Sequence, residues 1–136
     1  MPTAALTARV LLTGSLAGLA ACAGQGKGEA STRAPTYLGA EIAPLGDDLV
    51  AFRVSLKGSR DVTALEDYIR CTAAGYVQKQ GGGFLRHIRT NTDEEGGIWR
   101  ADAVYSVSSA LPKGLQTIDA EVTVDDCALR GIPTRD

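Results

Sequence analysis

One segment with a helical period lies among segments whose apolar residues alternate, and this order constrains the fold most. Apolar residues of the segment 62–80 recur every three to four positions, as on one face of an α-helix. They are Val62, Leu65, Ile69, Ala73 and Tyr76. Three glycines at 81–83 follow, and glycine ends a helix without steric cost. We therefore expect one long helix over residues 62–80.

Alternating apolar and polar residues predict the strands. In residues 49–57, every second side chain from Val50 to Leu56 is a large apolar one, as on a half-buried strand. A polar turn at 91–97 joins two further alternating runs into a predicted hairpin. Together with 49–57, the predicted strands cover residues 36–42, 84–90, 99–107 and 116–124.

Strands that are segregated around a single helix are typical of a two-layer α+β fold. We expect a mostly antiparallel sheet of about five strands, with the long helix packed on one face. The predicted domain covers residues 36–136 and follows a Gly-, Ser- and Ala-rich linker at 22–35.

The N-terminus has the parts of a secretory signal. Arg9 supplies positive charge, and an apolar core runs from Val10 to Ala21. This core is shorter than the roughly 20 apolar residues of a membrane-spanning helix. Leu19 and two alanines then precede Cys22, so residues 1–21 are predicted to be removed.

The residues Leu-Ala-Ala-Cys at 19–22 resemble the lipobox of bacterial lipoproteins. The resemblance implies diacylglycerol and acyl chains such as palmitate on Cys22, and a protein tethered to a membrane outside the cytoplasm. In Gram-negative lipoproteins, a residue other than Asp after the cysteine implies the periplasmic face of the outer membrane, and here it is Ala23. The alternative is an ordinary signal cut near Ala23, which would leave a soluble periplasmic protein.

With Cys22 lipidated, two cysteines remain in an oxidising compartment, and we expect a disulfide between Cys71 and Cys127. A free thiol, a redox pair and metal ligation are the alternatives, but neither CxxC nor zinc-ribbon spacing is present. Cys71 also belongs to a line of mostly small residues opposite the apolar stripe of the predicted helix. The C-terminal segment that carries Cys127 is therefore expected to cross this outer face.

The charge balance argues against a nucleic-acid partner. The 14 Lys and Arg include Arg9, so removal of the signal leaves 13 against 16 Asp and Glu, a formal charge of −3. Such a chain has no basic excess to attract a polyanion.

Residue patterns that carry catalysis are weak in this chain. His87 is the only histidine, and it is predicted to share a strand face with Leu85, Arg89 and Asn91. A Ser-His-Asp site remains formally open, although no G-x-S-x-G elbow supports it. The glycines at 81–83 follow a helix rather than a strand, unlike a phosphate loop. We therefore predict no enzyme activity, no metal site and no cofactor besides the lipid.

Four arginines are the strongest candidates for a binding surface. Alternation places them off the predicted core, where they would form a positive patch for an anionic partner on the open face of the sheet. They are Arg53, Arg86, Arg89 and Arg100. The alternative is ordinary cross-strand pairing with acidic residues, namely Asp102, Asp119 and Glu121.

These features favour a non-enzymatic, membrane-tethered envelope lipoprotein that presents its sheet face or edge to another envelope protein. The pattern loosely resembles small uncharacterised envelope lipoproteins of Gram-negative bacteria. The alternative is a periplasmic module that binds a lipid or glycan fragment in a cleft between helix and sheet. Its lining would be the bulky aromatic residues, namely Phe52, Tyr76, Trp99 and Tyr105.

Overall fold

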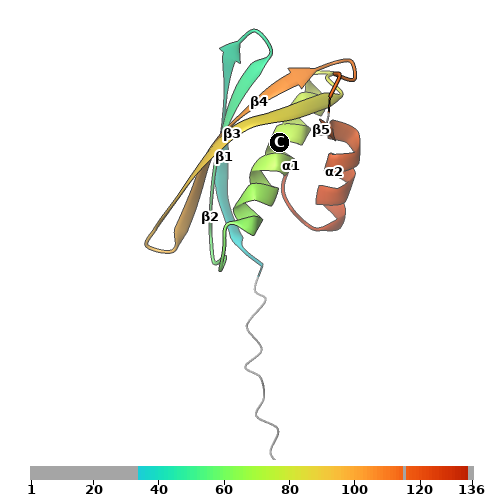
Figure 1. Ribbon diagram of the computed structural model, residues 1–136. Coiled ribbons are helices and arrows are strands. Elements are labelled where there is room, and N and C mark those ends of the chain that lie inside the picture. The colour runs from blue at the N-terminus through green and yellow to red at the C-terminus, as the bar shows by residue number, and fades with distance from the viewer. Residues whose placement is uncertain (1–33, 115, 135–136) are drawn as a thin grey trace, which may run out of the picture. The chain divides into compact units, whose positions relative to one another are not determined.

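Five strands form one sheet, and two helices lie on the same side of it (Figure 1). The computed structural model describes residues 34–114 and 116–134. The predicted signal, Cys22 and nearly all of the linker lie outside these residues. The elements are β1 (Thr36–Gly46), β2 (Leu49–Lys57), α1 (Thr63–Lys79), β3 (Phe84–Glu95), β4 (Ile98–Ser108), β5 (Thr117–Asp119) and α2 (Ala120–Leu129).

The strand order is β1-β2-β4-β3-β5, and every neighbouring pair is antiparallel. The predicted α+β class and antiparallel five-stranded sheet are therefore confirmed. Helix α1 connects β2 to β3, and β4 returns between these two strands. This path leaves four long strands side by side, with the short β5 at one edge.

The core lies between α1 and the strands, where the alternating residues of β2 and β4 meet the helix. Phe52, Leu56 and Ile69 are almost completely buried there. The helix begins at Thr63, whose amide donates a hydrogen bond to Asp61 Oδ1 at 2.9 Å. At the other end, Gly81 has a φ of 78°, a conformation that glycine adopts easily. The predicted helix over 62–80 is thus confirmed within one residue at each end.

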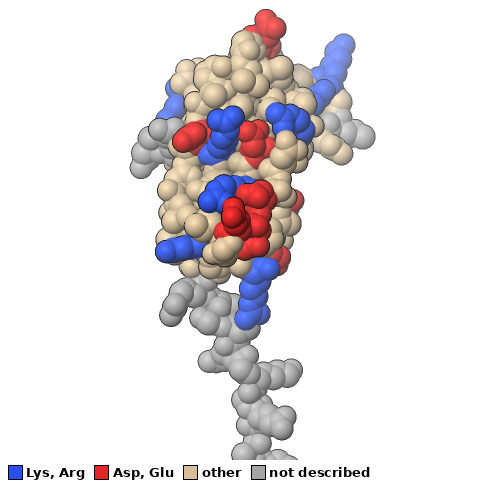
Figure 2. Space-filling model, turned by 90° about the vertical axis from the view of Figure 1, so that its left-hand side faces the viewer, with Lys and Arg blue, Asp and Glu red and all other residues tan. Residues whose placement is uncertain are grey.

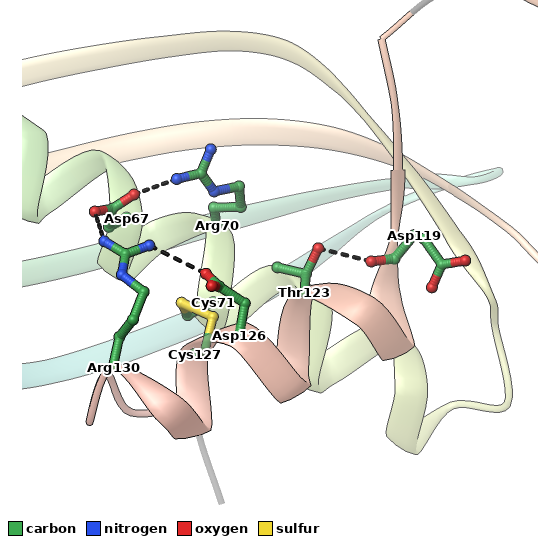
Figure 3. Close-up of a disulfide and its surroundings, with 8 residues drawn as sticks. All are labelled: Asp67, Arg70, Cys71, Asp119, Thr123, Asp126, Cys127 and Arg130. Carbon is green, nitrogen blue, oxygen red and sulfur yellow. Dashed lines mark hydrogen bonds and ion pairs between the residues drawn. A yellow bond between two sulfur atoms is a disulfide. The ribbon is translucent and has the colours of Figure 1, made fainter.

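The expectation of a single helix is wrong, because most of the predicted strand 116–124 belongs to α2. The strand β5 ends at Asp119, whose Oδ1 accepts a hydrogen bond from the Val122 amide at 3.1 Å and so caps the helix. Thr123 Oγ1 also donates to the Asp119 carbonyl at 2.6 Å (Figure 3). The alternation that suggested a strand is overridden by this cap. The buried residues Ala120 and Cys127 have a spacing of seven, which is also a helical one.

Helix α2 packs on the outer side of α1, so α1 lies between the sheet and α2 (Figure 1). The predicted disulfide joins Cys71 of α1 to Cys127 of α2, with a Cα–Cα distance of 5.9 Å (Figure 3). The chain after α2 also crosses α1. A Cβ atom added at Gly75 would lie 2.8 Å from Thr134 Cβ. The small residues on α1 therefore allow the C-terminal segment to approach the helix closely, as the sequence predicted.

The hairpin of β3 and β4 differs from the prediction at its turn. Both strands continue past residue 91 and meet at Gly96 and Gly97, which have φ values of 60° and 79°. Positive φ at both central residues is what a tight two-residue hairpin turn requires. The polar residues 91–95, predicted as a turn, therefore belong to β3 and make the hairpin longer than predicted.

Candidate functional site

The face of the sheet opposite the helices is open and carries charged side chains. The register of β1, β2, β4 and β3 places Glu41, Arg53, Asp102 and Asn91 in one row across the four strands. In the adjacent row, Arg100 of β4 lies opposite Asp93 of β3. Figure 2 shows acidic and basic side chains alternating across this face.

The charges of this face are paired with one another. Arg53 Nε donates a hydrogen bond to Asp102 Oδ2 at 2.8 Å, and this bond raises the pKa of Arg53 above its usual value. Arg89 Nη2 lies 3.8 Å from Asp102 Oδ1, and Arg100 Nη1 lies 3.6 Å from Asp93 Oδ2. The face is therefore a network of both signs rather than a positive surface.

Three of the four predicted arginines come together on this face, and Arg86 does not join their network. Arg86 lies near β5, and its Nη2 donates to the Lys113 carbonyl at 2.6 Å. The alternative of cross-strand pairing holds for Asp102, whereas Asp119 caps α2 and Glu121 lies on α2. An anionic partner for the arginines stays a prediction.

A shallow hollow of about 620 Å³ crosses the middle of the open face. Its size is within the range of small-molecule sites, and all four long strands contribute to it. Polar groups of Ser55, Asn91 and Arg100 line it, together with Leu38 at the β1 edge. Gly39 has a φ of 133°, and a Cβ atom added there would meet no other atom within 4 Å. The hollow is thus open over β1.

The aromatic residues predicted to line a cleft are packed in or against the core. The Phe52 ring contacts Tyr76 and Tyr105 edge-on, at centroid distances of 5.7 and 5.8 Å, and Trp99 is half-buried against the same cluster. Burial raises the pKa of Tyr105 to about 12. The helix–sheet layer opens at one end, where a hollow of about 450 Å³ lies beside Tyr76 and the turn between β1 and β2.

His87 lies on the helix side of β3, stacked edge-on against Tyr105 at 5.3 Å. Its Nε2 forms a hydrogen bond with Thr90 Oγ1 at 2.7 Å. The predicted face shared with Leu85 is confirmed, since Leu85 also lies in the core. The register shifts between His87 and Arg89, so the prediction is wrong for Arg89 and Asn91, which the bulge at Ile88 places on the open face. These contacts of His87 contain no Ser-His-Asp arrangement.

Asp67 is a site that the sequence did not reveal. It lies outside the predicted apolar stripe of α1, yet it is only 8% exposed. Its carboxylate pairs with Arg70 on α1 and with Arg130 just after α2 (Figure 3). The hydrogen bonds that Arg130 donates to Asp67 and Asp126 raise the pKa of Arg130. The ion pairs and the disulfide therefore hold α2 against α1 at the same place. The sequence prediction missed this site because it did not include α2.

Two further features are absent from the described residues, a membrane-spanning helix and a metal site. Neither helix there is long and apolar enough to cross a membrane. Groups of three or more His, Cys, Asp and Glu that would hold a metal ion are absent from residues 34–114 and 116–134.

Comparison with known proteins identifies the family. The family described as the YNQ4 C-terminal domain matches residues 37–131, a segment that reaches from β1 through α2. A protein of Paracoccus denitrificans, described as an uncharacterized 26.9 kDa protein in the nqo8 5′ region, is 31% identical over 103 residues. The match covers 71% of this chain but only 40% of that relative. No solved structure matches significantly. The chain belongs to the YNQ4 C-terminal domain family.

Proposed function

We propose that this member of the YNQ4 C-terminal domain family is a lipid-tethered envelope protein without enzyme activity, and that the open face of its sheet contacts another protein. The single observation that carries the contact surface is the charged face of β1 to β4. The helices leave one of the two faces of the sheet uncovered. Rows of paired charges extend over four strands on this face.

The lipid tether rests on the sequence at 19–22, and the disulfide agrees with it. Disulfides persist in oxidising compartments, and Cys71 and Cys127 are bonded to each other. Cys22 would then be the cysteine left for lipid. More than one acyl chain is needed for stable membrane attachment, and lipidation of Cys22 supplies them. Ala23 favours the outer membrane over the inner membrane.

The tether is tested by Cys22→Ser in the full chain. We expect the wild-type protein in the membrane fraction, labelled by radioactive palmitate. The variant should lose the label, because it has no thiol to accept diacylglycerol. The double variant Cys71→Ser/Cys127→Ser is the control, since it removes two cysteines and should keep the label. A wild-type chain without label would contradict the proposal.

The contact surface is tested by photo-crosslinking in intact cells. A photo-reactive phenylalanine analogue replaces Ser55, which lies in the hollow of the open face. The matched control carries the same analogue at Ala128, an exposed residue of α2. We expect discrete protein adducts from position 55 and not from position 128. The absence of adducts from position 55 would refute a protein contact at this face.

The hollow favours a second candidate, a module that binds a small polar ligand. Its volume of about 620 Å³ would hold a glycan or lipid-headgroup fragment, and unpaired polar groups of Ser55 and Asn91 line it. Native mass spectrometry of the chain purified from membranes would detect an adduct of several hundred daltons that is lost on unfolding. A bare chain would speak against this candidate.

A further inference from the structure

The order of charges across the open face makes this face complementary to itself. In the row formed by β1, β2 and β4, the side chains are Glu41, Arg53 and Asp102. The β3 position of this row is Asn91, and Arg89, two residues before it on the same face, extends to Asp102 and supplies the fourth charge. Read across the sheet, the signs are negative, positive, negative, positive. When a second copy of these four charges is rotated by 180° about an axis parallel to the strands, each charge lies opposite a charge of the other sign.

We infer that the partner of the open face is a second copy of this chain, packed face to face about a twofold axis parallel to the strands. This inference rests on the proposed function, because it names the protein that the open face contacts. In this arrangement Arg53 faces Asp102 of the other copy, and Glu41 faces its Arg89. A twofold interface repeats each contact by symmetry, so the Arg53–Asp102 pair becomes part of a four-membered network.

The shape of a twisted sheet agrees with the same axis. All sheets twist with one hand, and two identically twisted sheets pack with their strand directions aligned to within about 30°. A twofold axis parallel to the strands keeps the strands of both copies aligned in this way. A twofold axis in the plane but across the strands would instead place Glu41 over Glu41 and Arg53 over Arg53 of the second copy.

The direction of the tether is a third, independent argument. Strand β1 begins at Thr36, opposite Lys57 at one end of the sheet. An axis parallel to the strands leaves Thr36 of both copies at the same end. The β1 ends nearest the proposed tether would therefore lie at the same end of the dimer, whereas the other axis would place them at opposite ends.

The area of the face indicates a weak dimer that needs the membrane. Four strands about 4.8 Å apart and about 30 Å long cover roughly 550 Å², less than the roughly 800 Å² per partner of a standard stable interface. Tethering to one surface raises the effective concentration of the second copy. The interface is polar, and waters in the hollow remain between the two faces, as in other wet interfaces.

Charge reversal in trans tests the inference on the full lipidated chain. Cells without another copy of the gene produce two differently tagged forms, and copurification of the tags after mild crosslinking measures association. Arg53→Asp with itself, and Asp102→Arg with itself, should each copurify at least tenfold less than wild type, because like charges then face each other. The mixture of Arg53→Asp with Asp102→Arg should return to near the wild-type level, since opposite charges face each other again.

This rescue separates the interface from the fold, because the pair within each chain stays broken in the mixture. The control pair is Arg60→Asp with Glu121→Arg, which has the same charge changes at exposed positions outside the face. Each control should associate with itself as wild type does. Losses in the controls equal to those on the face, wild-type association of Arg53→Asp with itself, or failure of the mixture to recover would each overturn the inference.

The crosslinks from position 55 then distinguish this inference from the proposed function. An adduct with the mass of two chains that carries both tags supports both. Adducts of another mass overturn the second copy as partner and leave the contact surface in place. No adduct refutes the contact surface and the dimer together.

Discussion

Different side-chain interactions stabilise the two faces of the sheet, although both faces share the same backbone hydrogen bonds. Phe52 and Arg53 are adjacent on β2, yet Phe52 is fully buried under α1 while most of the Arg53 side chain is exposed. The helix face is stabilised by removal of apolar surface from water. The charged side chains of the open face form ion pairs in solvent, and such pairs contribute little to stability. This difference means that the open face is free to change for binding without loss of the fold.

The largest effect is expected on the helix face. Phe52→Ala removes a fully buried ring that contacts Tyr76 and Tyr105, and it should lower the free energy of unfolding by roughly 3 to 5 kcal/mol. Urea unfolding followed by circular dichroism measures this. A loss below about 1 kcal/mol would mean that the cavity collapses, and that the contrast between the two faces is smaller than the burial indicates.

The disulfide extends the comparison to the layer behind α1. The double variant Cys71→Ser/Cys127→Ser opens a loop of 56 residues and should cost roughly 2 to 4 kcal/mol. Helix α2 should lose protection first, because the disulfide and the ion pair of Arg130 with Asp67 hold it to α1 at the same place. Amide hydrogen exchange read separately for α2 and for the strands checks this. Equal loss of protection in α2 and in the strands would show that α2 does not unfold separately from the sheet.

The pH dependence of stability reports the burial of the helix face. Burial raises the pKa of Tyr105 to about 12 from its ordinary value of 10.0. Between these values the unfolded chain releases the proton while the folded chain keeps it. The free energy of unfolding should therefore fall as the pH rises from 10 to 12, by roughly 2 to 3 kcal/mol.

Tyr105→Phe should remove this part of the pH dependence, and Tyr37→Phe is the matched control on the same face. Burial raises the pKa of Tyr37 as well, while Arg130 lowers it, so the control removes a separate titration. The measurement is urea unfolding at a series of pH values from 8 to 12. If wild type and Tyr105→Phe lose stability in parallel, Tyr105 is not the group responsible.

The smallest effect is expected on the open face. Arg53→Ala breaks the solvent-exposed pair with Asp102 and should change the free energy of unfolding far less than Phe52→Ala does, with a still smaller change at high salt. Its neighbour Phe52→Ala is the matched comparison. A loss as large as that of Phe52→Ala would mean that the charged network is part of what holds the sheet together.

The sequence alone determined β2 and α1 to within a residue, the antiparallel sheet and the disulfide. These features depend on local periods of two and 3.6 residues and on the small number of cysteines. Tertiary structure decided whether residues 120–124 are strand or helix, because apolar residues alternate there and also recur at helical spacing. The Asp119 cap and the packing of α2 against α1 favour the helix.

Tertiary structure also decided what the candidate site is. The sequence placed the arginines off the core, but the pairing of Arg53, Arg89 and Asp102 depends on strand order and on the bulge at Ile88, which shifts the register of β3. Asp67 became an ion-pair centre because the chain just after α2 brings Arg130 to it. Side-chain periodicity is a property of neighbouring residues, so it shows which face a residue occupies. Charge partners come from other strands and helices, and packing alone brings them within reach.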